Sequence, residues 1–385
     1  LADAIGIDHR DAQLGDGLPA EVLGLPRATI ADAANAKTVI LLGPDLKEEL
    51  PVLYLRLRDA ATQGRTKIIE FSARTTGMSP YSWRSVRYTP GTAPIEIAAE
   101  LSATEVSDQL ALGDVVLVAG RANLAESEAT AMAAVDAVLE AVPGATVLPA
   151  LRRGNVVGAL QLGMAPTAPD RDATATLTAA AEGKLDLLIL LGADPLNDHP
   201  DADLARRALA GARHIISIDV LPSESTQVAD LVLPAAAFGE QDGTTTNLEG
   251  RVSRVSQKVT VHGTARPDWM IAADLALMLG HDVGFAAVDE CTTLIADTVP
   301  AYAEAKVAAV DADPEGVLAV ASFDRPERDD LGEHAPSGYD YRLVVSRTLY
   351  DRALGTTMSP SLAKLGRETA AHVHPHDLDR IGEPA

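Results

Sequence analysis

The sequence predicts an α/β protein with two units, each built on a parallel sheet that is covered by helices. Two segments carry this prediction: Val39–Leu42 and Leu188–Leu191 are continuous apolar runs, which is the pattern of strands buried on both faces. Each run leads into a Gly-x-Asp turn, a proline suited to a helix start and a helical stretch. The composition agrees, because 47% hydrophobic but only 3% aromatic residues favour a helix-rich chain over an all-β one.

The second half of each repeat completes a strand–helix–strand segment. The predicted helices end near Gly64 and Gly211, and further strands follow at residues 67–71 and 214–219. Parallel strands joined by such crossovers have right-handed connections and form a doubly wound sheet. The repeat therefore predicts two Rossmann-like, doubly wound units within one chain.

A third strand–helix–strand segment sets the predicted domain boundary. Strands are expected over residues 114–119 and 146–148, with an alanine-rich helix over 125–142 between them. Because a glycine interrupts the chain before the first of these strands, we place the boundary near Leu112. The predicted divisions are a first Rossmann-like unit at 1–112, a second at 113–285, a helical segment and linker at 286–340, and a further domain beginning at 341–385.

The C-terminal third carries weaker patterns. Helices are predicted over Asp268–Leu279 and around Cys291. Tyr341–Ser346 and Thr369–Val373 are strand-like. The chain starts on a leucine and stops soon after the last strand-like segment, so we expect it to be part of a longer polypeptide.

Charge, hydropathy and cysteine content argue against several classes of function. A net charge of −23 argues against a nucleic-acid partner, which requires a basic face. No apolar run approaches the roughly 20 residues of a membrane helix, so no direct membrane span is expected. The one cysteine, Cys291, cannot supply the about four ligands of an iron–sulfur cluster. We expect Cys291 to be a buried thiol in a helix core.

Acidic residues follow the strands of the second repeat. The turn Gly192–Pro195 comes directly after one strand, and Asp219 ends the next. Open α/β sheets bind ligands outside the carboxyl ends of their strands, where a carboxylate can contact a ribose hydroxyl or a guanine edge. The same aspartates can instead cap helices or turns. In the first repeat, Asp45 followed by Glu48 predicts a capping box.

The stretch that ends at Arg251 is the most distinctive part of the sequence. Leu231–Leu233 is a predicted short buried strand, and the loop after it is dense in polar residues and glycines. Asn247 and Arg251 can fix a carbonyl, a phosphate or a neighbouring loop, whereas Glu240 and Glu249 can bind Arg251 internally. Both interpretations stay open at this point: a ligand loop and a self-satisfied structural loop.

The pattern A-D-x-V-L-P…E-x-D-G-T-x-T-N-x-E-G-R-V, over residues 229–252, resembles the molybdopterin oxidoreductase family. Within that family the chain is most similar to the C-terminal part of the G subunit of bacterial NADH-quinone oxidoreductase, respiratory complex I. Residues 265–269 resemble the family as well, and residues 371–378 resemble the start of its C-terminal barrel. One departure is Ser253, where many members of the family have glutamine.

The resemblance implies a fold and a set of site residues. The two Rossmann-like units correspond to domains II and III of molybdopterin oxidoreductases, truncated before the C-terminal barrel. The implied site is vestigial, with contacts to the nucleotide of a molybdopterin but no catalytic and no metal-binding residues. These implied cofactor contacts are Gly192, Asp194, Pro195, Asp219, Glu240, Gly243, Asn247 and Arg251.

The resemblance also implies a role and partners. The chain would be a redox-inactive scaffold in the peripheral arm of complex I, beside the other hydrophilic subunits, on the cytoplasmic face of the bacterial plasma membrane. That complex passes electrons from NADH through FMN and iron–sulfur clusters to quinone, coupled to proton translocation. No cofactor is expected in these residues, and the iron–sulfur clusters are expected in sequence that precedes them.

Two alternatives remain. One is a fragment of the catalytic subunit of a molybdopterin-dependent formate dehydrogenase or nitrate reductase, in which molybdopterin guanine dinucleotide would be bound. The other is a generic nucleotide-binding module, which is weakened by the missing G-x-G-x-x-G motif.

Two further constellations are weak candidates for a site. His372, His374 and His376 share one face of a strand-like segment, but a proline interrupts it and no cysteine completes a set, so no metal is expected. Ser361 and Lys364 have S-x-x-K spacing without the partner motifs that this nucleophile requires.

Overall fold

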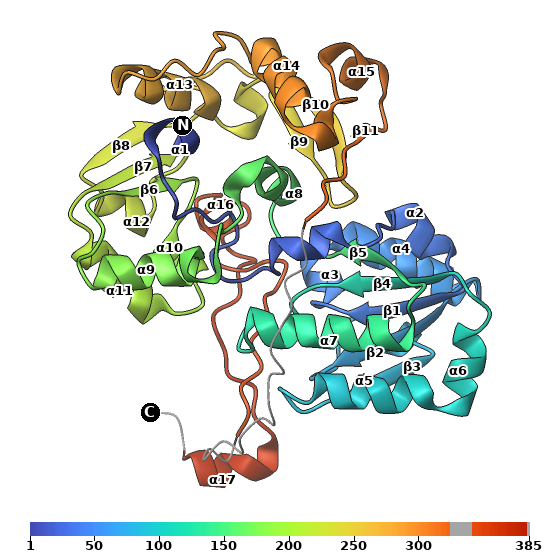
Figure 1. The fold of residues 1–385 in the computed structure, drawn as a ribbon. Coiled ribbons are helices and arrows are strands. Elements are labelled where there is room, and N and C mark those ends of the chain that lie inside the picture. Colours follow the sequence, from blue (N-terminus) through green and yellow to red (C-terminus); the bar gives the residue numbers. More distant parts are fainter. Residues whose placement is uncertain (324–340, 383–385) are drawn as a thin grey trace.

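Two α/β units dominate the computed structural model, which describes residues 1–323 and 341–382 (Figure 1). The first unit holds a five-stranded parallel sheet in the order β3-β2-β1-β4-β5. This confirms the predicted α/β class and the first strand–helix–strand repeat. The strands are β1 (Thr38–Leu42), β2 (Lys67–Ser72), β3 (Arg84–Arg87), β4 (Val115–Ala119) and β5 (Thr146–Pro149).

Helices cover both faces of this sheet. Successive side chains along a strand point to opposite faces, so apolar residues in sequence along β1 need a helix layer on each face. Ile40 of β1 packs in one buried cluster with side chains of α5, α6 and α7, and Val39 packs in another with α2 and α4. All five residues of β1 are buried, as a continuous apolar run predicts. The helices are α2 (Ile30–Asn35), α3 (Leu46–Glu49), α4 (Pro51–Thr62), α5 (Ala93–Ser102), α6 (Thr104–Leu110) and α7 (Glu128–Ala141).

The second unit is smaller and holds a three-stranded parallel sheet in the order β6-β7-β8. Leu209 of α11 packs on one face of this sheet, and Ile271 of α13 packs on the other. The predicted helix that begins at Asp268 is confirmed. The elements are β6 (Leu188–Leu191), β7 (Ile215–Asp219), β8 (Leu231–Pro234), α9 (Ala173–Ala181), α10 (Pro195–Asp198), α11 (Ala202–Gly211), α12 (Glu224–Gln227) and α13 (Asp268–Met278).

A small antiparallel sheet follows, in which β9 (Gly243–Thr246) and β10 (Arg251–Val255) form a hairpin and β11 (Val317–Leu318) adds a third strand. Residues on and near α14 (Val288–Thr298) and α15 (Val307–Ala312) close its apolar face. Remaining short elements are α1 (Ala2–Ile5), α8 (Val156–Ala159), α16 (Leu354–Thr357), α17 (Leu378–Ile381), a π turn at Leu160–Met164, and 3₁₀ turns at Ala20–Gly24, Ser79–Tyr81, Pro169–Arg171, Phe238–Glu240, Pro300–Tyr302 and Pro375–Asp377.

The boundary predicted near Leu112 is wrong. β4 pairs directly with β1, with Val116 opposite Val39, so residues 115–149 complete the first sheet and do not begin a second unit. Gly113 lies in the left-handed region and makes a turn, which starts a strand but not a domain. β1 is a central strand of the sheet. It pairs with β2 on one side and with β4 on the other.

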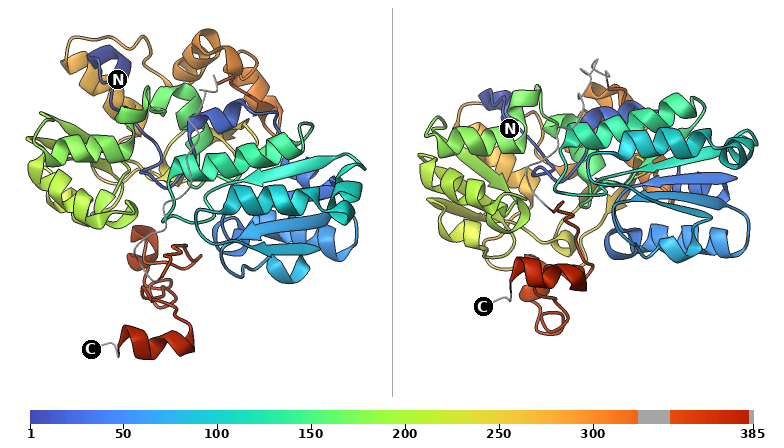
Figure 2. Two further views of the ribbon diagram at one scale, coloured as in Figure 1. Left: turned by 60° about the horizontal axis from the view of Figure 1, so that its bottom comes forward. Right: turned by 90° about the horizontal axis from the view of Figure 1, so that it is seen from below.

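Two other predictions fail. β8 was expected to be buried, yet Leu231 and Val232 are each 46% exposed, because β8 is an edge strand. The barrel strands expected at Tyr341–Ser346 and Thr369–Val373 are also absent from the described part of 341–382. That segment begins at Tyr341, whose ring lies 5.6 Å from the guanidinium carbon of Arg380 in α17. α17 stands away from the two α/β units (Figure 2). Residues 324–340 of the predicted linker, and 383–385, lie outside the described residues.

Within residues 1–323 and 341–382, no helix combines the length and the apolar character that crossing a membrane requires.

Candidate functional site

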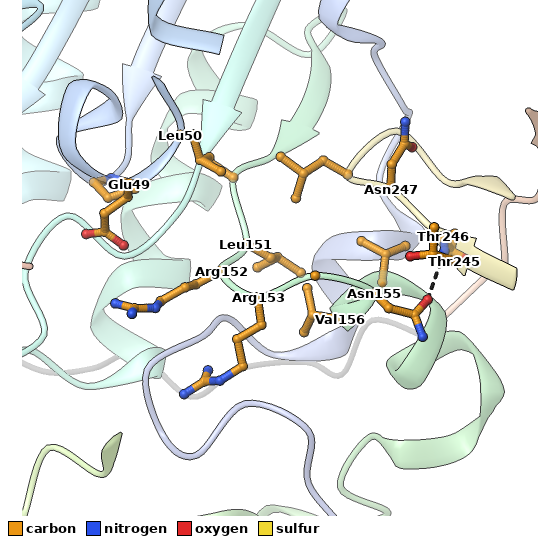
Figure 3. A pocket seen from close by; sticks show the side chains of 15 residues that line it. Glu49, Leu50, Leu151, Arg152, Arg153, Asn155, Val156, Thr245, Thr246 and Asn247 are labelled. Carbon is orange, nitrogen blue, oxygen red and sulfur yellow. Dashed lines mark hydrogen bonds between the residues drawn. The ribbon is translucent and has the colours of Figure 1, made fainter. Parts of the chain in front are cut away.

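A cavity of about 390 Å³ opens at the carboxyl ends of β1 and β5 (Figure 3). The β9–β10 hairpin forms its remaining wall. Open α/β sheets bind ligands outside the carboxyl ends of their strands, which makes this cavity a candidate site. The lining residues are Pro44, Glu49, Leu50, residues 150–157 and residues 245–248.

The loop after β5 shapes the cavity and brings positive charge to it. Arg152 and Arg153 both extend from this loop (Figure 3). Arg153 and Asn155 adopt φ values of 78° and 63°, a left-handed conformation that residues other than glycine rarely take. The Asn155 Oδ1 atom accepts a hydrogen bond of 2.8 Å from the Thr246 N–H, so the hairpin holds the loop in this shape.

Carboxylates neutralise these arginines. Asp16, whose side chain has no exposed surface, forms ion pairs with Arg153 and with Arg347, the latter at 2.9 Å. The closest ion pair of Arg152 is with Asp351, at 3.6 Å. A charge this deeply buried is tolerated only when it is paired, so Asp16 and its two arginines form one structural cluster.

Glu49 brings a further carboxyl group to the cavity wall. Burial raises its pKa, while the positive charges of Arg152 and Arg347 act in the opposite direction. The site thus combines arginines with acids that oppose them.

The predicted site residues of the second repeat lie together at the end of β6 and β7. Gly192 takes the left-handed conformation (φ 56°) that its turn needs, and Pro195 begins α10. The buried Asp194 carboxylate accepts hydrogen bonds from Ser225 Oγ at 2.5 Å and from Asn197 Nδ2 at 2.6 Å. Both oxygens of Asp194 are therefore engaged within the protein.

The capping predictions have mixed outcomes. Asp219 accepts a hydrogen bond from the Val220 N–H at 2.7 Å, which is a local turn contact. Asp45 accepts from the Lys47 N–H at 3.2 Å and so caps α3. The capping box with Glu48 is wrong, because Glu48 accepts from the backbone of Leu349 instead.

The predicted residues of the polar loop also have internal partners. Glu240 accepts from the Ala237 N–H at 2.9 Å. Asn247 accepts from the N–H of Arg251 at 2.9 Å, which fixes the turn between β9 and β10. The Arg251 guanidinium donates to Glu249 at 2.9 Å and to the Gly316 carbonyl at 3.1 Å. Gly243 begins β9 and has open space where a side chain would stand.

This loop also fastens the hairpin to the first unit. Glu249 accepts a hydrogen bond of 2.6 Å from the Ile30 N–H, and the Leu248 carbonyl accepts one of 2.7 Å from Arg27. Of the two interpretations that the sequence leaves open, the contacts match the structural one. Of the two glutamates expected to bind Arg251, Glu249 does so, whereas Glu240 accepts from the Ala237 N–H.

The eight predicted contacts to the nucleotide of a molybdopterin stand in two groups. Four of the eight predicted contacts stand at the ends of β6 and β7, and the other four on or beside the hairpin, with no hydrogen bond between the two groups in the described residues. Both Asp194 oxygens, the Asn247 side-chain oxygen and two of the Arg251 guanidinium nitrogens bond to the protein itself.

The other candidates stay apart from the cavity. His372, His374 and His376 are exposed, and in the described ranges no three His, Cys, Asp or Glu side chains come together as a metal site. Cys291 is only partly buried on α14, in contrast to the core position expected, and burial raises its pKa.

Sequence reasoning missed the residues that shape the cavity. Arg152, Arg153 and Asn155 follow β5 directly, and this Arg-Arg-Gly-Asn sequence at a strand end was an available signal. Asp16 and Arg347 are 331 residues apart and carry no local signal.

Comparisons with known proteins show which family and which relatives this chain is similar to. A molybdopterin oxidoreductase family model matches residues 23–277. The chain is 24% identical to the NADPH-Fe(3+) oxidoreductase subunit alpha of Geobacter sulfurreducens, over 99% of this chain and 54% of that one. It is 30% identical to the G subunit of the NADH-quinone oxidoreductase of Mycobacterium bovis, over 62% and 33%. It is 26% identical to the F420-dependent formate dehydrogenase 1 subunit alpha of Methanococcus maripaludis, over 54% and 34%.

Among solved structures, acetylene hydratase from Pelobacter acetylenicus matches 68% of this chain and 49% of its own, with 14% identity and a TM-score of 0.44. The chain spans about half the length of the Geobacter relative and a third of the other two. The family model covers well over half of the chain, and the distinctive hairpin sequence lies inside the matched range. The chain belongs to the molybdopterin oxidoreductase family.

Proposed function

We propose that this chain is a redox-inactive scaffold in the peripheral arm of an NADH-quinone oxidoreductase, as part of its G subunit. The observation that carries the proposal is the internal use of the implied cofactor contacts. Asp194 is bonded to Ser225 and Asn197, and Arg251 to Glu249, so these groups serve packing. The similarity to the G subunit of the Mycobacterium bovis enzyme supports the same role.

The partners under this proposal are the other hydrophilic subunits of the complex, on the cytoplasmic face of the bacterial plasma membrane. The complex passes electrons from NADH through FMN and iron–sulfur clusters to quinone, coupled to proton translocation. One cysteine cannot ligate an iron–sulfur cluster, so those clusters belong to sequence outside these residues.

The test is the molybdenum and pterin content of the full-length protein, measured after purification beside an active molybdopterin enzyme. The proposal expects neither molybdenum nor pterin at a meaningful fraction of the chain. Stoichiometric molybdenum and pterin would overturn it. Co-purification with NADH-oxidising and quinone-reducing subunits would support the assignment to that complex.

A second candidate is a catalytic-subunit fragment of a molybdopterin-dependent formate dehydrogenase or nitrate reductase. The similarity to the F420-dependent formate dehydrogenase 1 subunit alpha favours it. Under this alternative the full-length protein, expressed with cofactor supply, reduces a dye with formate or oxidises one with nitrate. The scaffold proposal expects neither activity.

A further inference from the structure

The C-terminal segment Leu343–Asp351, here called the strap, runs across the junction of the two α/β units (Figures 1 and 2). It begins on the loop after β4, where the Asn123 side chain donates to the Leu343 carbonyl at 3.2 Å and accepts from the Val345 N–H at 2.9 Å. The Leu124 N–H donates to the Val345 carbonyl at 3.0 Å. These bonds fix one end of the strap to the first unit.

Arg347 in the middle of the strap contacts both units. Its guanidinium donates to the Asp16 carboxylate at 2.9 Å and to the Asp198 carbonyl at 3.1 Å. Asp16 is tied to the first unit through Arg153, and Asp198 is the last residue of α10 in the second unit. One side chain therefore bridges the two units.

The rest of the strap passes over the carboxyl ends of the first sheet. The Leu349 N–H donates to Glu48 in α3, which follows β1, at 3.0 Å. Asp351 pairs with Arg152, after β5, at 3.6 Å. The strap thus lies along the edge at which open α/β sheets bind their ligands, and it holds an arginine of the cavity.

The strap is attached mainly by polar contacts. Leu343 is 69% exposed and Leu349 45% exposed, so little apolar surface stabilises it. The Nε atom of Arg347 is buried without a hydrogen-bond partner among the described residues, which costs free energy as long as the strap is closed. When the strap opens, the buried Asp16 carboxylate still has its ion pair with Arg153. Segments with few buried apolar contacts are the first to open.

We propose that the strap is a releasable closure over the carboxyl edge of the first sheet, with Arg347 as the side chain that fastens it to both units. Release frees the edge of the first sheet and exposes the loop of Arg152 and Arg153 to solutes and partners. The inference is independent of the proposed scaffold role, because it concerns how the two units are held and not which complex contains them.

Hydrogen exchange followed by mass spectrometry, on the full-length protein, tests the closure. In the Arg347→Met variant, peptides with Val345, Leu349 and residues 120–126 exchange about tenfold faster, as expected for losing a hydrogen bond to a charged group. Trypsin cleaves after Arg152 or Arg153 more readily. The matched control is Arg352→Met, an exposed arginine just after the strap, which leaves both readouts unchanged.

Protection of β1 and β7 peptides shows whether a variant is still folded. A second variant, Glu48→Ala, removes only the acceptor for the Leu349 N–H and raises exchange there alone. This result supports the closure even if Arg347→Met does not fold. The proposal is overturned if strap peptides of the wild-type protein already exchange without protection. It is equally overturned if Glu48→Ala leaves exchange at Leu349 unchanged, or if folded Arg347→Met exchanges like Arg352→Met.

Discussion

Glu249 in the β9–β10 hairpin accepts a hydrogen bond of 2.6 Å from the backbone N–H of Ile30, the first residue of α2. The two residues are 219 positions apart in the sequence. The other oxygen of Glu249 accepts from Arg251 at 2.9 Å. A carboxylate at a helix N-terminus is favourable because it meets unpaired N–H groups and the positive end of the helix dipole. One side chain therefore caps a helix of the first unit and holds the arginine of the family pattern.

Replacing Glu249 with alanine should destabilise the protein. The change removes the bond to Ile30 and leaves the partly buried Arg251 without its carboxylate, with a cost of about 1–3 kcal/mol in the free energy of unfolding. Chemical unfolding measures it, with the exposed Glu304→Ala as the control that stays within about 0.5 kcal/mol. Equal stability of the two variants would contradict a structural role for this loop.

Asp194→Asn separates a packing role from a ligand role. The two donors, Ser225 Oγ and Asn197 Nδ2, bond to different oxygens of Asp194, so the amide nitrogen of the variant would face one of them in a buried site. We therefore expect a loss of about 1–3 kcal/mol with no ligand present. Asp219→Asn is the matched control, since an amide oxygen still accepts from the Val220 N–H. If Asp194→Asn and the wild-type protein have the same denaturant midpoint of unfolding, the bonds of Asp194 to Ser225 and Asn197 do not stabilise the fold.

The protein should lose stability as the pH rises from about 4.5 to about 7, because of Glu128. Burial raises the pKa of Glu128 to about 7, with Arg121 acting against it and Asp11, Asp172 and Asp16 adding to it. A carboxyl whose folded pKa is raised contributes its full stability below its unfolded pKa and loses it as the pH passes the folded value. The window is therefore about pH 4.5 to 7.

Glu128→Gln should remove much of this dependence, by about 2 kcal/mol between the ends of that window. Arg121 keeps its bonds to the carbonyls of Gly17 and Glu126, so the variant leaves no bare buried charge. Unfolding curves of both proteins at several pH values provide the measurement. Curves that shift in parallel for wild type and variant would show that Glu128 does not titrate in this range.

Tyr302 joins the hairpin to the segment after β5. Its buried hydroxyl contacts the Thr246 hydroxyl at 3.0 Å and donates to the Gln161 side chain at 3.0 Å. Tyr302→Phe leaves both partners short of a bond and should cost about 1–3 kcal/mol. Tyr350→Phe, at a half-exposed tyrosine, is the control for the loss of a hydroxyl as such. Matching unfolding midpoints for the two variants would argue against the Thr246–Tyr302–Gln161 chain as a structural bond.

Local pattern was enough to predict the strands and helices that frame the site. The apolar runs at β1 and β6, the turns after them and the helix that begins at Asp268 are where the sequence places them. These features depend on side chains within a few residues of each other, and strand and helix periodicity report such local arrangements directly. The polar loop before Arg251 was also recognisable, because no apolar core requires so many donors and acceptors.

The partners of these elements were decided by the tertiary structure alone. The pairing of β4 with β1, the contact of Glu249 with Ile30 and the bridge from Arg347 to Asp16 each join residues far apart in the chain. A strand has the same apolar pattern whichever neighbour it pairs with, and a carboxylate has the same chemistry whether it meets a ligand or a backbone N–H. The sequence by itself determined two parallel α/β units of the molybdopterin oxidoreductase type. Only the folded chain decided which groups the buried polar side chains contact, because contacts such as Glu249 with Ile30 exist only once distant segments are packed together.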